Sequence, residues 1–75
     1  MASRPPRLGV VVEFDAERGL GAVDDAAGRR WPFHCARISD GSREIGVGER
    51  VAFTVGPGAP GVWEAATVVK LGAGA

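Results

Sequence analysis

The stretch GVVVEFDAERGLGAV, residues 9–23, decides the fold because it predicts two β-strands joined by a short turn. It begins with an unbroken β-branched and apolar run, continues with the turn-forming segment DAERG, and ends in a second apolar run. This spacing is typical of two antiparallel strands in a hairpin. Gly19 and Gly21 lie where the second strand begins, although glycine normally weakens a strand, so these two positions need an explanation.

Three further strands are expected after this hairpin. The turn DDAAG at residues 24–28 and the loop GPGAPG at residues 56–61 separate segments rich in β-branched and aromatic residues. Residues 36–48 are irregular, with one helical turn expected near residues 36–38. The pattern predicts an all-β fold, a five-stranded antiparallel barrel of the oligonucleotide-binding type, because closure removes the edges of a small sheet. The expected strands cover residues 8–14, 20–24, 29–35, 50–55 and 62–71.

The length of 75 residues allows one small domain and too little buried surface for a deep catalytic cleft. Nine acidic and nine basic residues cancel, so the net charge does not indicate a nucleic-acid partner. Cys35 is the single cysteine and no apolar run reaches the length of a membrane span, so we expect a cytoplasmic protein without membrane contact. We expect a mobile arm at residues 1–7, the folded domain at 8–71 and a flexible tail at 72–75.

Several blocks of the chain, within residues 9–71, resemble the bacterial cold-shock domain family. The opening GVVVEFDAERGLGAV is similar to the family's GTVKWFNAEKGFGFI, and WPFHCARI is similar to VFVHFSAI. GERVAFTV and AATVVKL are similar to GQKVSFEV and AANVVKL. The resemblance implies a barrel whose outer face stacks bases on aromatic side chains, with glycines that let the second strand curve tightly. It also implies a cytoplasmic binder of single-stranded RNA or DNA, of the RNA chaperone type, that needs no cofactor.

Most of the family's stacking aromatics are replaced in this chain. His34 keeps the family's residue type, and the other ring positions hold Glu13, Leu20, Ala22, Pro32, Cys35 and Ser42. Base stacking is worth about 1–3 kcal/mol per base, so losing four such contacts costs roughly 4 kcal/mol even at the low end of that range, about a thousandfold in affinity. Phosphate contacts remain available, with Arg18 at a lysine position of the family. The nucleic-acid-binding residues implied by the resemblance are Arg18, Leu20, Pro32, His34, Arg37 and Lys70, with Arg29 and Arg30 as further cations.

Alternation along the strands predicts which aromatic side chains lie in the core. If His34 points to solvent, its neighbours on the same strand at positions 31 and 33 point inward. The expected core aromatics are Trp31, Phe33, Phe14 and Phe53, and the pattern assigns Trp63 to neither face. Aromatic content is thus expected inside the sheet and not on its outer face.

No enzyme and no metal site are expected. His34 and Cys35 are neighbours on a strand and face opposite sides, and the chain holds no other histidine or cysteine. Asp24 and Asp25 are expected to form a turn, since the sequence places no acid–base partner beside them.

Two classes of function stay open. The first is weak or altered binding of single-stranded RNA or DNA, dominated by phosphate contacts. The second is a protein-interaction barrel whose former nucleic-acid face contacts a protein partner. For the second, the expected patch consists of Leu20, Ala22, Pro32 and Cys35, rimmed by Glu13, Arg18 and His34. A continuous positive stripe on the outer sheet face would favour nucleic acid, and a neutral apolar patch would favour protein.

Overall fold

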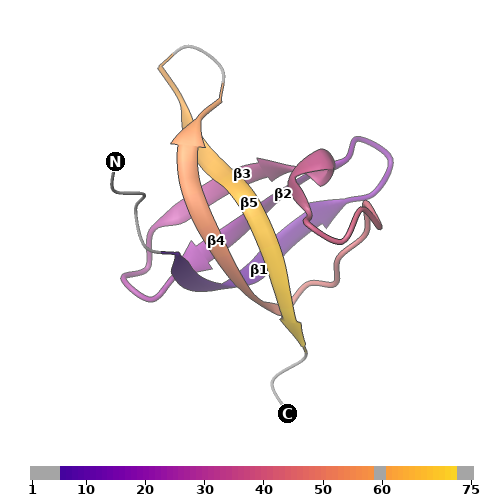
Figure 1. Cartoon of the computed structure of the whole chain (residues 1–75), viewed down its shortest axis with the longest axis horizontal. Helices are drawn as coiled ribbons and strands as arrows, with labels where there is room; N and C mark the ends of the chain where they lie inside the picture. Colours follow the sequence, from indigo (N-terminus) through magenta and orange to yellow (C-terminus); the bar gives the residue numbers. More distant parts are fainter. Residues whose placement is uncertain (1–5, 59–60, 73–75) are drawn as a thin grey trace.

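The chain forms one antiparallel sheet of five strands (Figure 1). The computed structural model describes residues 6–58 and 61–72. Neighbouring strands pair in the order β3-β2-β1-β4-β5, which confirms the expected all-β class. A single 3-10 turn follows the third strand, close to the expected helical turn. The elements are β1 (Arg7–Asp15), β2 (Leu20–Asp25), β3 (Arg30–His34), η1 (Cys35–Arg37), β4 (Arg50–Pro57) and β5 (Trp63–Gly72).

The strand ends differ from the expected ones by one or two residues. Arg7 pairs with Phe53 and Gly72 pairs with Arg50, so these two residues belong to strands and not to the expected arm and tail. Most of that arm and tail lies outside the described residues. No helix in the described part of the chain has the length and apolarity to cross a bilayer.

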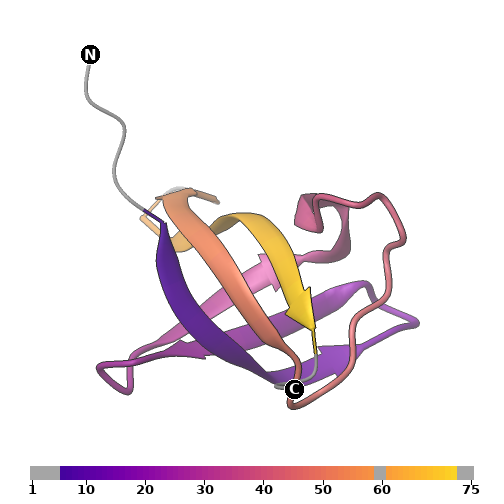
Figure 2. The same cartoon turned by 60° about the horizontal axis from the view of Figure 1, so that its bottom comes forward.

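The sheet curls but does not close through backbone pairing. β3 and β5 are its two edge strands, and Figure 2 shows β4 and β5 crossing over the layer formed by β1, β2 and β3. The backbones of β3 and β5 nevertheless lie close to each other across this gap. Within residues 6–58 and 61–72 these two strands form no ladder, so the expectation of a closed barrel is not met. The interior is sealed by packing between the layers.

A bulge at Val12 decides which side chains of β1 face outward. The β1–β2 register shifts between Val11 and Glu13, so one extra residue sits in β1. Without the bulge, alternation from the fully buried Val11 would point Glu13 inward. With it, Glu13 faces solvent and Phe14 packs against the core. The bulge thereby keeps a carboxylate out of an apolar interior, where burial without a partner would be costly.

The core lies between the two layers and contains the expected aromatic rings. Trp31, Phe33 and Phe53 are at most 4% exposed. Phe14 stacks on Phe33 with ring centroids 6.1 Å apart and ring planes 7° from parallel. The inward assignment of these four rings is therefore confirmed. Besides these rings, the buried cluster includes Val11, Val23, Cys35, Ile38, Ile45, Val51, Ala65 and Val68.

The two glycines of the first hairpin are required for different reasons. Gly19 has φ 66°, a left-handed conformation that favours glycine, and a Cβ there would lie 2.7 Å from the Cys35 Sγ. Gly21 has no positive φ, but a Cβ there would lie 2.6 Å from the Phe33 ring and 2.7 Å from the Glu13 carbonyl oxygen. Both glycines therefore let β2 lie close to the residues beneath it.

We expect Gly21→Ala to lower the free energy of unfolding by about 1–3 kcal/mol, because the new methyl group overpacks the core against Phe33. Urea unfolding followed by fluorescence would measure the change. Gly46→Ala is the matched control, because the Cβ at Gly46 meets no atom closer than 3.9 Å. Equal stability of the two variants would contradict the close approach at Gly21.

Pro32 lies in the middle of edge strand β3 without costing the ladder a hydrogen bond. The Cys35 N–H donates to the Gly19 carbonyl, and the Asp25 N–H donates to the Arg29 carbonyl. Bonded and non-bonded pairs alternate between these two ends, which makes Ala22–Pro32 a non-bonded pair. The position of the missing N–H therefore points away from β2, as is usual for proline in an edge strand. On the opposite edge, the Ser39 N–H donates to the Val68 carbonyl of β5 at 2.8 Å.

Candidate functional site

The outward side chains of β2, β3 and the second half of β1 form three cross-strand rows, which we call the outer platform. Residues directly opposite each other on paired strands point to the same face, so the register gives the rows. The first row is Asp15, Leu20 and His34, the second is Glu13, Ala22 and Pro32, and the third ends in Asp24 and Arg30. The fold thus brings three of the expected nucleic-acid-binding residues onto one surface, namely Leu20, Pro32 and His34. The Glu13 carboxylate, which would repel a phosphate, lies on the same surface.

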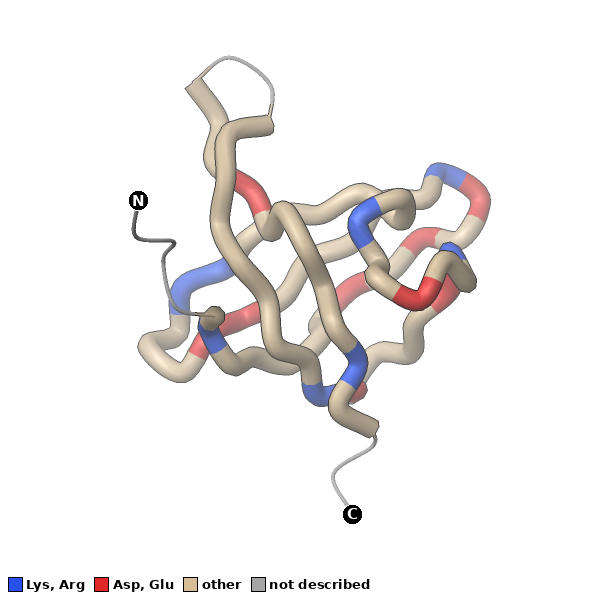
Figure 3. Tube along the Cα trace, in the orientation of Figure 1, with Lys and Arg blue, Asp and Glu red and all other residues tan. Residues whose placement is uncertain are grey.

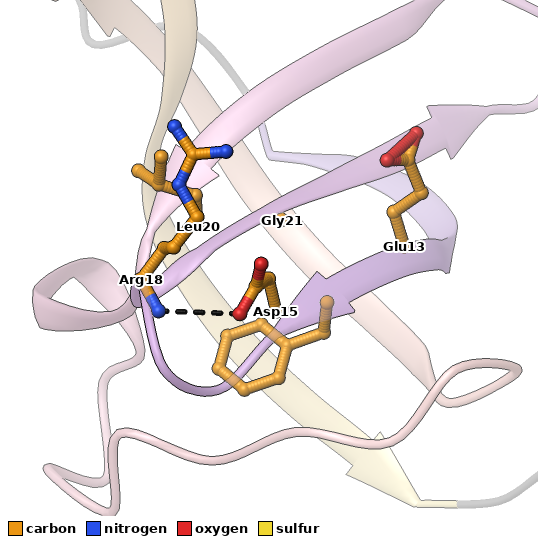
Figure 4. Close-up of a pocket in the computed structure, with 6 residues that line it drawn as sticks. Glu13, Asp15, Arg18, Leu20 and Gly21 are labelled. Carbon is orange, nitrogen blue, oxygen red and sulfur yellow. Dashed lines mark hydrogen bonds between the residues drawn. The ribbon is translucent and has the colours of Figure 1, made fainter.

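The first row forms an open end of the platform. Leu20 is 43% exposed and lies directly across from His34, which is also exposed. Arg18, Leu20 and Glu13 help line an open hollow of about 290 Å³, and Figure 4 shows Arg18 near the start of β2 and Glu13 farther along β1. Within residues 6–58 and 61–72, the guanidinium of Arg18 forms no ion pair. An incoming anion would therefore meet the Arg18 guanidinium at this end, although the carboxylates of Glu13 and Asp15 line the same hollow.

His34 is held in one orientation by the turn that follows it. As the N-cap of η1, its Nδ1 accepts a hydrogen bond from the Ala36 N–H at 3.1 Å. In the neutral ring this leaves the proton on Nε2, so that atom is a donor available to a ligand. The ring and the Leu20 side chain beside it form an apolar surface with one hydrogen-bond donor at its border.

The third row is neutralised by its own charges. Arg30 forms a two-pronged ion pair with Asp24, with distances of 2.7 and 3.1 Å, and its Nη1 lies 4.0 Å from the Glu13 carboxylate. The hydrogen bond from Arg30 lowers the pKa of Asp24, and the same contact raises the pKa of Arg30. Asp24 is therefore an ion-pair residue and not the turn former expected from the sequence. Arg30 has little charge to offer a phosphate.

Asp25, in contrast, organises the β2–β3 turn as expected and also reaches the core. Its carboxylate accepts the Ala27 and Arg29 N–H groups and the indole Nε1–H of Trp31, each at 2.9 Å. The Trp31 hydrogen bond is the main reason why the pKa of Asp25 is lowered. The guanidiniums of Arg7 and Arg29 lie over the Trp31 ring at 5.1 and 4.2 Å from its centroid. Arg29 thus covers Trp31 and is not part of the outer platform.

Two of the cations expected to contact phosphate, Arg37 and Lys70, each lie beside a carboxylate. Arg37 lines a second hollow of about 370 Å³ together with His34, and its Nε lies 3.8 Å from the Glu64 carboxylate. Lys70 is bound to the β3–β4 loop, because its Nζ lies 3.0 Å from Asp40 and 2.9 Å from the Ser42 Oγ. The Ser42 N–H, and then Lys70, lower the pKa of Asp40 to about 2. Arg37 therefore borders the site, whereas Lys70 fastens a loop.

Two members of the expected protein-binding patch are buried. Ala22 points outward by its register but is 8% exposed, between its cross-strand neighbours Glu13 and Pro32. Cys35 is also 8% exposed and belongs to the buried cluster, because it follows the outward His34 and its side chain points to the opposite face. The exposed apolar part of the patch is thus smaller than expected and consists of Leu20 and Pro32.

Charges of both signs are interspersed over the molecule. Figure 3 shows basic and acidic segments close together around the trace, with no side reserved for one sign. On the outer platform, the carboxylates of Glu13, Asp15 and Asp24 outnumber the Arg30 guanidinium. The described residues contain no group of three histidine, cysteine or acidic side chains able to hold a metal ion. A continuous positive stripe is therefore absent from the described part of this face.

Sequence reasoning missed a second exposed surface on the other half of the sheet. Leu8 on β1 pairs with Ala52 on β4, and Ala52 pairs with Val69 on β5, so these side chains form one outward row. A signal was present, because both the inward and the outward positions of these strands are apolar. We call this surface the apolar strip, and it consists of Leu8, Val10, Ala52, Val69 and Leu71.

Comparisons with known proteins assign no family to this chain. No family model matches it, and no curated protein matches it either.

Proposed function

We propose that the chain is a divergent cold-shock-like domain, with the strand order of an oligonucleotide-binding fold, that binds single-stranded RNA or DNA weakly at the open end of its outer platform. The observation that carries this proposal is the exposed Leu20–His34 pair beside an unpaired Arg18. A base can pack on the Leu20 and His34 side chains while its phosphate meets the guanidinium. Arg37 lines a neighbouring hollow together with His34 and can help guide the strand.

Binding should be confined to this end because the rest of the platform opposes a polyanion. Glu13 and Asp24 place carboxylates on the path, and Arg30 is engaged by both. With one or two phosphate contacts and few stacking surfaces, the affinity depends mainly on charge. The function is therefore short-range and weak contact with single strands, not tight coverage of a long segment.

A protein ligand is the second candidate, and the carboxylates of the platform favour it. Glu13, Asp15 and Asp24 would attract a basic segment more readily than a phosphate backbone. Leu20 and Pro32 would supply its apolar contact. The two candidates differ in the sign of the ligand's charge, so a titration can separate them.

Fluorescent oligothymidine should bind the parent protein at low salt and dissociate as salt rises. Two phosphate contacts on a single strand give a slope of about −1.4 in log K against log salt, or roughly a sevenfold loss between about 50 and 200 mM. Arg18→Ala should lower the affinity and reduce the slope by about 0.7, because one contact is lost. Anisotropy at several salt concentrations measures both quantities.

Arg50→Ala is the matched control for this titration, because it removes the same charge from β4, outside the outer platform. It should leave the slope unchanged. Equal effects of the two substitutions would place the binding site elsewhere. If the parent shows no binding even at low salt, nucleic acid is excluded and the protein ligand becomes the better candidate.

A further inference from the structure

The apolar strip is an exposed apolar surface on the described part of the sheet that the proposed nucleic-acid contact does not use. Leu8 is 61% exposed, and Val10, Val69 and Leu71 are 39%, 40% and 48% exposed. The register places Leu8, Ala52 and Val69 in one row across three paired strands. Contiguous apolar side chains of this kind on a small soluble domain usually mark a contact surface.

We propose that the apolar strip binds a second copy of this chain, face to face, in a weak symmetric dimer. A symmetric dimer needs a surface that is complementary to itself. The strip meets this need when a twofold axis runs parallel to the strands over the seam between β1 and β4. Each β1 then lies on β4 of the second copy, and the residue pairs of the β1–β4 register become contacts between copies.

Side-chain size fits this arrangement. Leu8 and Ala52 are cross-strand partners within one chain, so the twofold axis brings each Leu8 onto Ala52 of the second copy. The most exposed large side chain of the strip thereby packs on its smallest one, twice. Large-on-small packing is how two sheet faces interdigitate.

Charge also fits this arrangement. Arg50 pairs with Val10 in the β1–β4 register and forms no ion pair within the described part of the chain. The same axis places Arg50 over Val10 of the second copy, one strand away from Asp24, at a strand spacing of about 4.8 Å. Its guanidinium can then approach the carboxylate of Asp24 of the second copy, which would be shared with the Arg30 that already binds it. The chain has nine acidic and nine basic residues, so two copies carry no net repulsion at neutral pH.

The size of the molecule limits the strength of this contact. A standard stable interface buries about 800 Å² on each partner, roughly a sixth of the 4901 Å² of accessible surface of this chain. The strip contains five residues, fewer than the roughly 20–30 on each side of a standard interface, and it lies on the convex side of a curled sheet. The proposed contact is therefore weak, and we expect the dimer at high protein concentration.

Sedimentation velocity from about 10 µM to about 1 mM tests the proposal. The parent should shift from the one-chain to the two-chain species over this range. Leu8→Ser should weaken association about tenfold or more, since it removes the central apolar contact. Val47→Ser is the matched control, because Val47 is 66% exposed but lies outside the strip. It should sediment as the parent does.

Ala52→Leu separates a specific dimer from general stickiness. It adds apolar surface to the strip, so unspecific association would increase. In the proposed arrangement the new side chain meets Leu8 of the second copy and association falls. Thermal melts check that each variant is folded, which matters most for Ala52→Leu because Ala52 is half-buried. A parent that stays a monomer at about 1 mM, an unaffected Leu8→Ser, or stronger association of Ala52→Leu would each overturn the proposal, and the first would leave the strip to a different protein.

Discussion

Trp31→Ala should lower the free energy of unfolding by about 3–5 kcal/mol, a large share of the stability of so small a domain. The Trp31 ring is 4% exposed and belongs to the buried cluster. Its removal leaves a cavity and also takes away the indole N–H that donates to Asp25 at 2.9 Å. The Arg7 and Arg29 guanidiniums lose the ring beneath them. Urea unfolding followed by far-UV circular dichroism would measure the loss.

Trp31→Phe is the control that separates volume from hydrogen bonding. Phenylalanine keeps most of the apolar contact but cannot donate to Asp25, so we expect a smaller loss of about 1–2 kcal/mol plus some volume cost. A Trp31→Ala variant that melts within a few degrees of the parent would show that the ring does not carry the core.

Adding two rings to the outer platform, one at its open end and one in the next row, should raise the affinity for single-stranded oligonucleotide by on the order of thirtyfold or more. The double variant is Glu13→Trp with Leu20→Phe. Both positions are exposed and point outward in adjacent rows of the platform. Each ring offers a stacking surface worth about 1–3 kcal/mol, and the first substitution also removes a carboxylate from the path. Ala22 is not used, because it is 8% exposed.

Glu13→Gln with Leu20→Met is the matched control for this gain. It removes the same carboxylate and keeps an apolar side chain at position 20, but it adds no ring. Titration of oligothymidine at one salt concentration compares both variants with the parent. If the control gains as much as the ring variant, charge alone limits binding. A folded ring variant with unchanged affinity would mean that bases do not reach this face.

The strands and core could be predicted from the sequence because each depends on local pattern. Alternation placed Trp31 and Phe33 inside, and the short turns between strands predicted the antiparallel pairing. Closure could not be predicted in this way, because it depends on whether β3 and β5 come within hydrogen-bonding distance. Such pairing between strands distant in the sequence is set by the curl of the whole sheet.

The candidate site was predicted less completely, because the state of a charged side chain depends on its neighbours in space. Leu20 and His34 do lie side by side on an exposed face. Arg30, however, forms an ion pair with Asp24, and Lys70 forms one with Asp40. The spacing of these residues in the sequence does not predict either pair. Cys35 lies in the core, as alternation predicts for the neighbour of an outward His34, so its place in the expected protein-binding patch is wrong.

The placement of Pro32 has a consequence for how molecules of this protein can assemble. An uncovered edge strand lets one molecule add to the next without limit, and such head-to-tail growth ends in fibres. At the middle of β3, a carbonyl group of an approaching strand finds no N–H donor, because the outward position is occupied by Pro32. On β5 the Val68 carbonyl is already taken by Ser39. These two features make open-ended growth through the edges of the sheet unfavourable, and in the proposed dimer association through the apolar strip would stop at two copies.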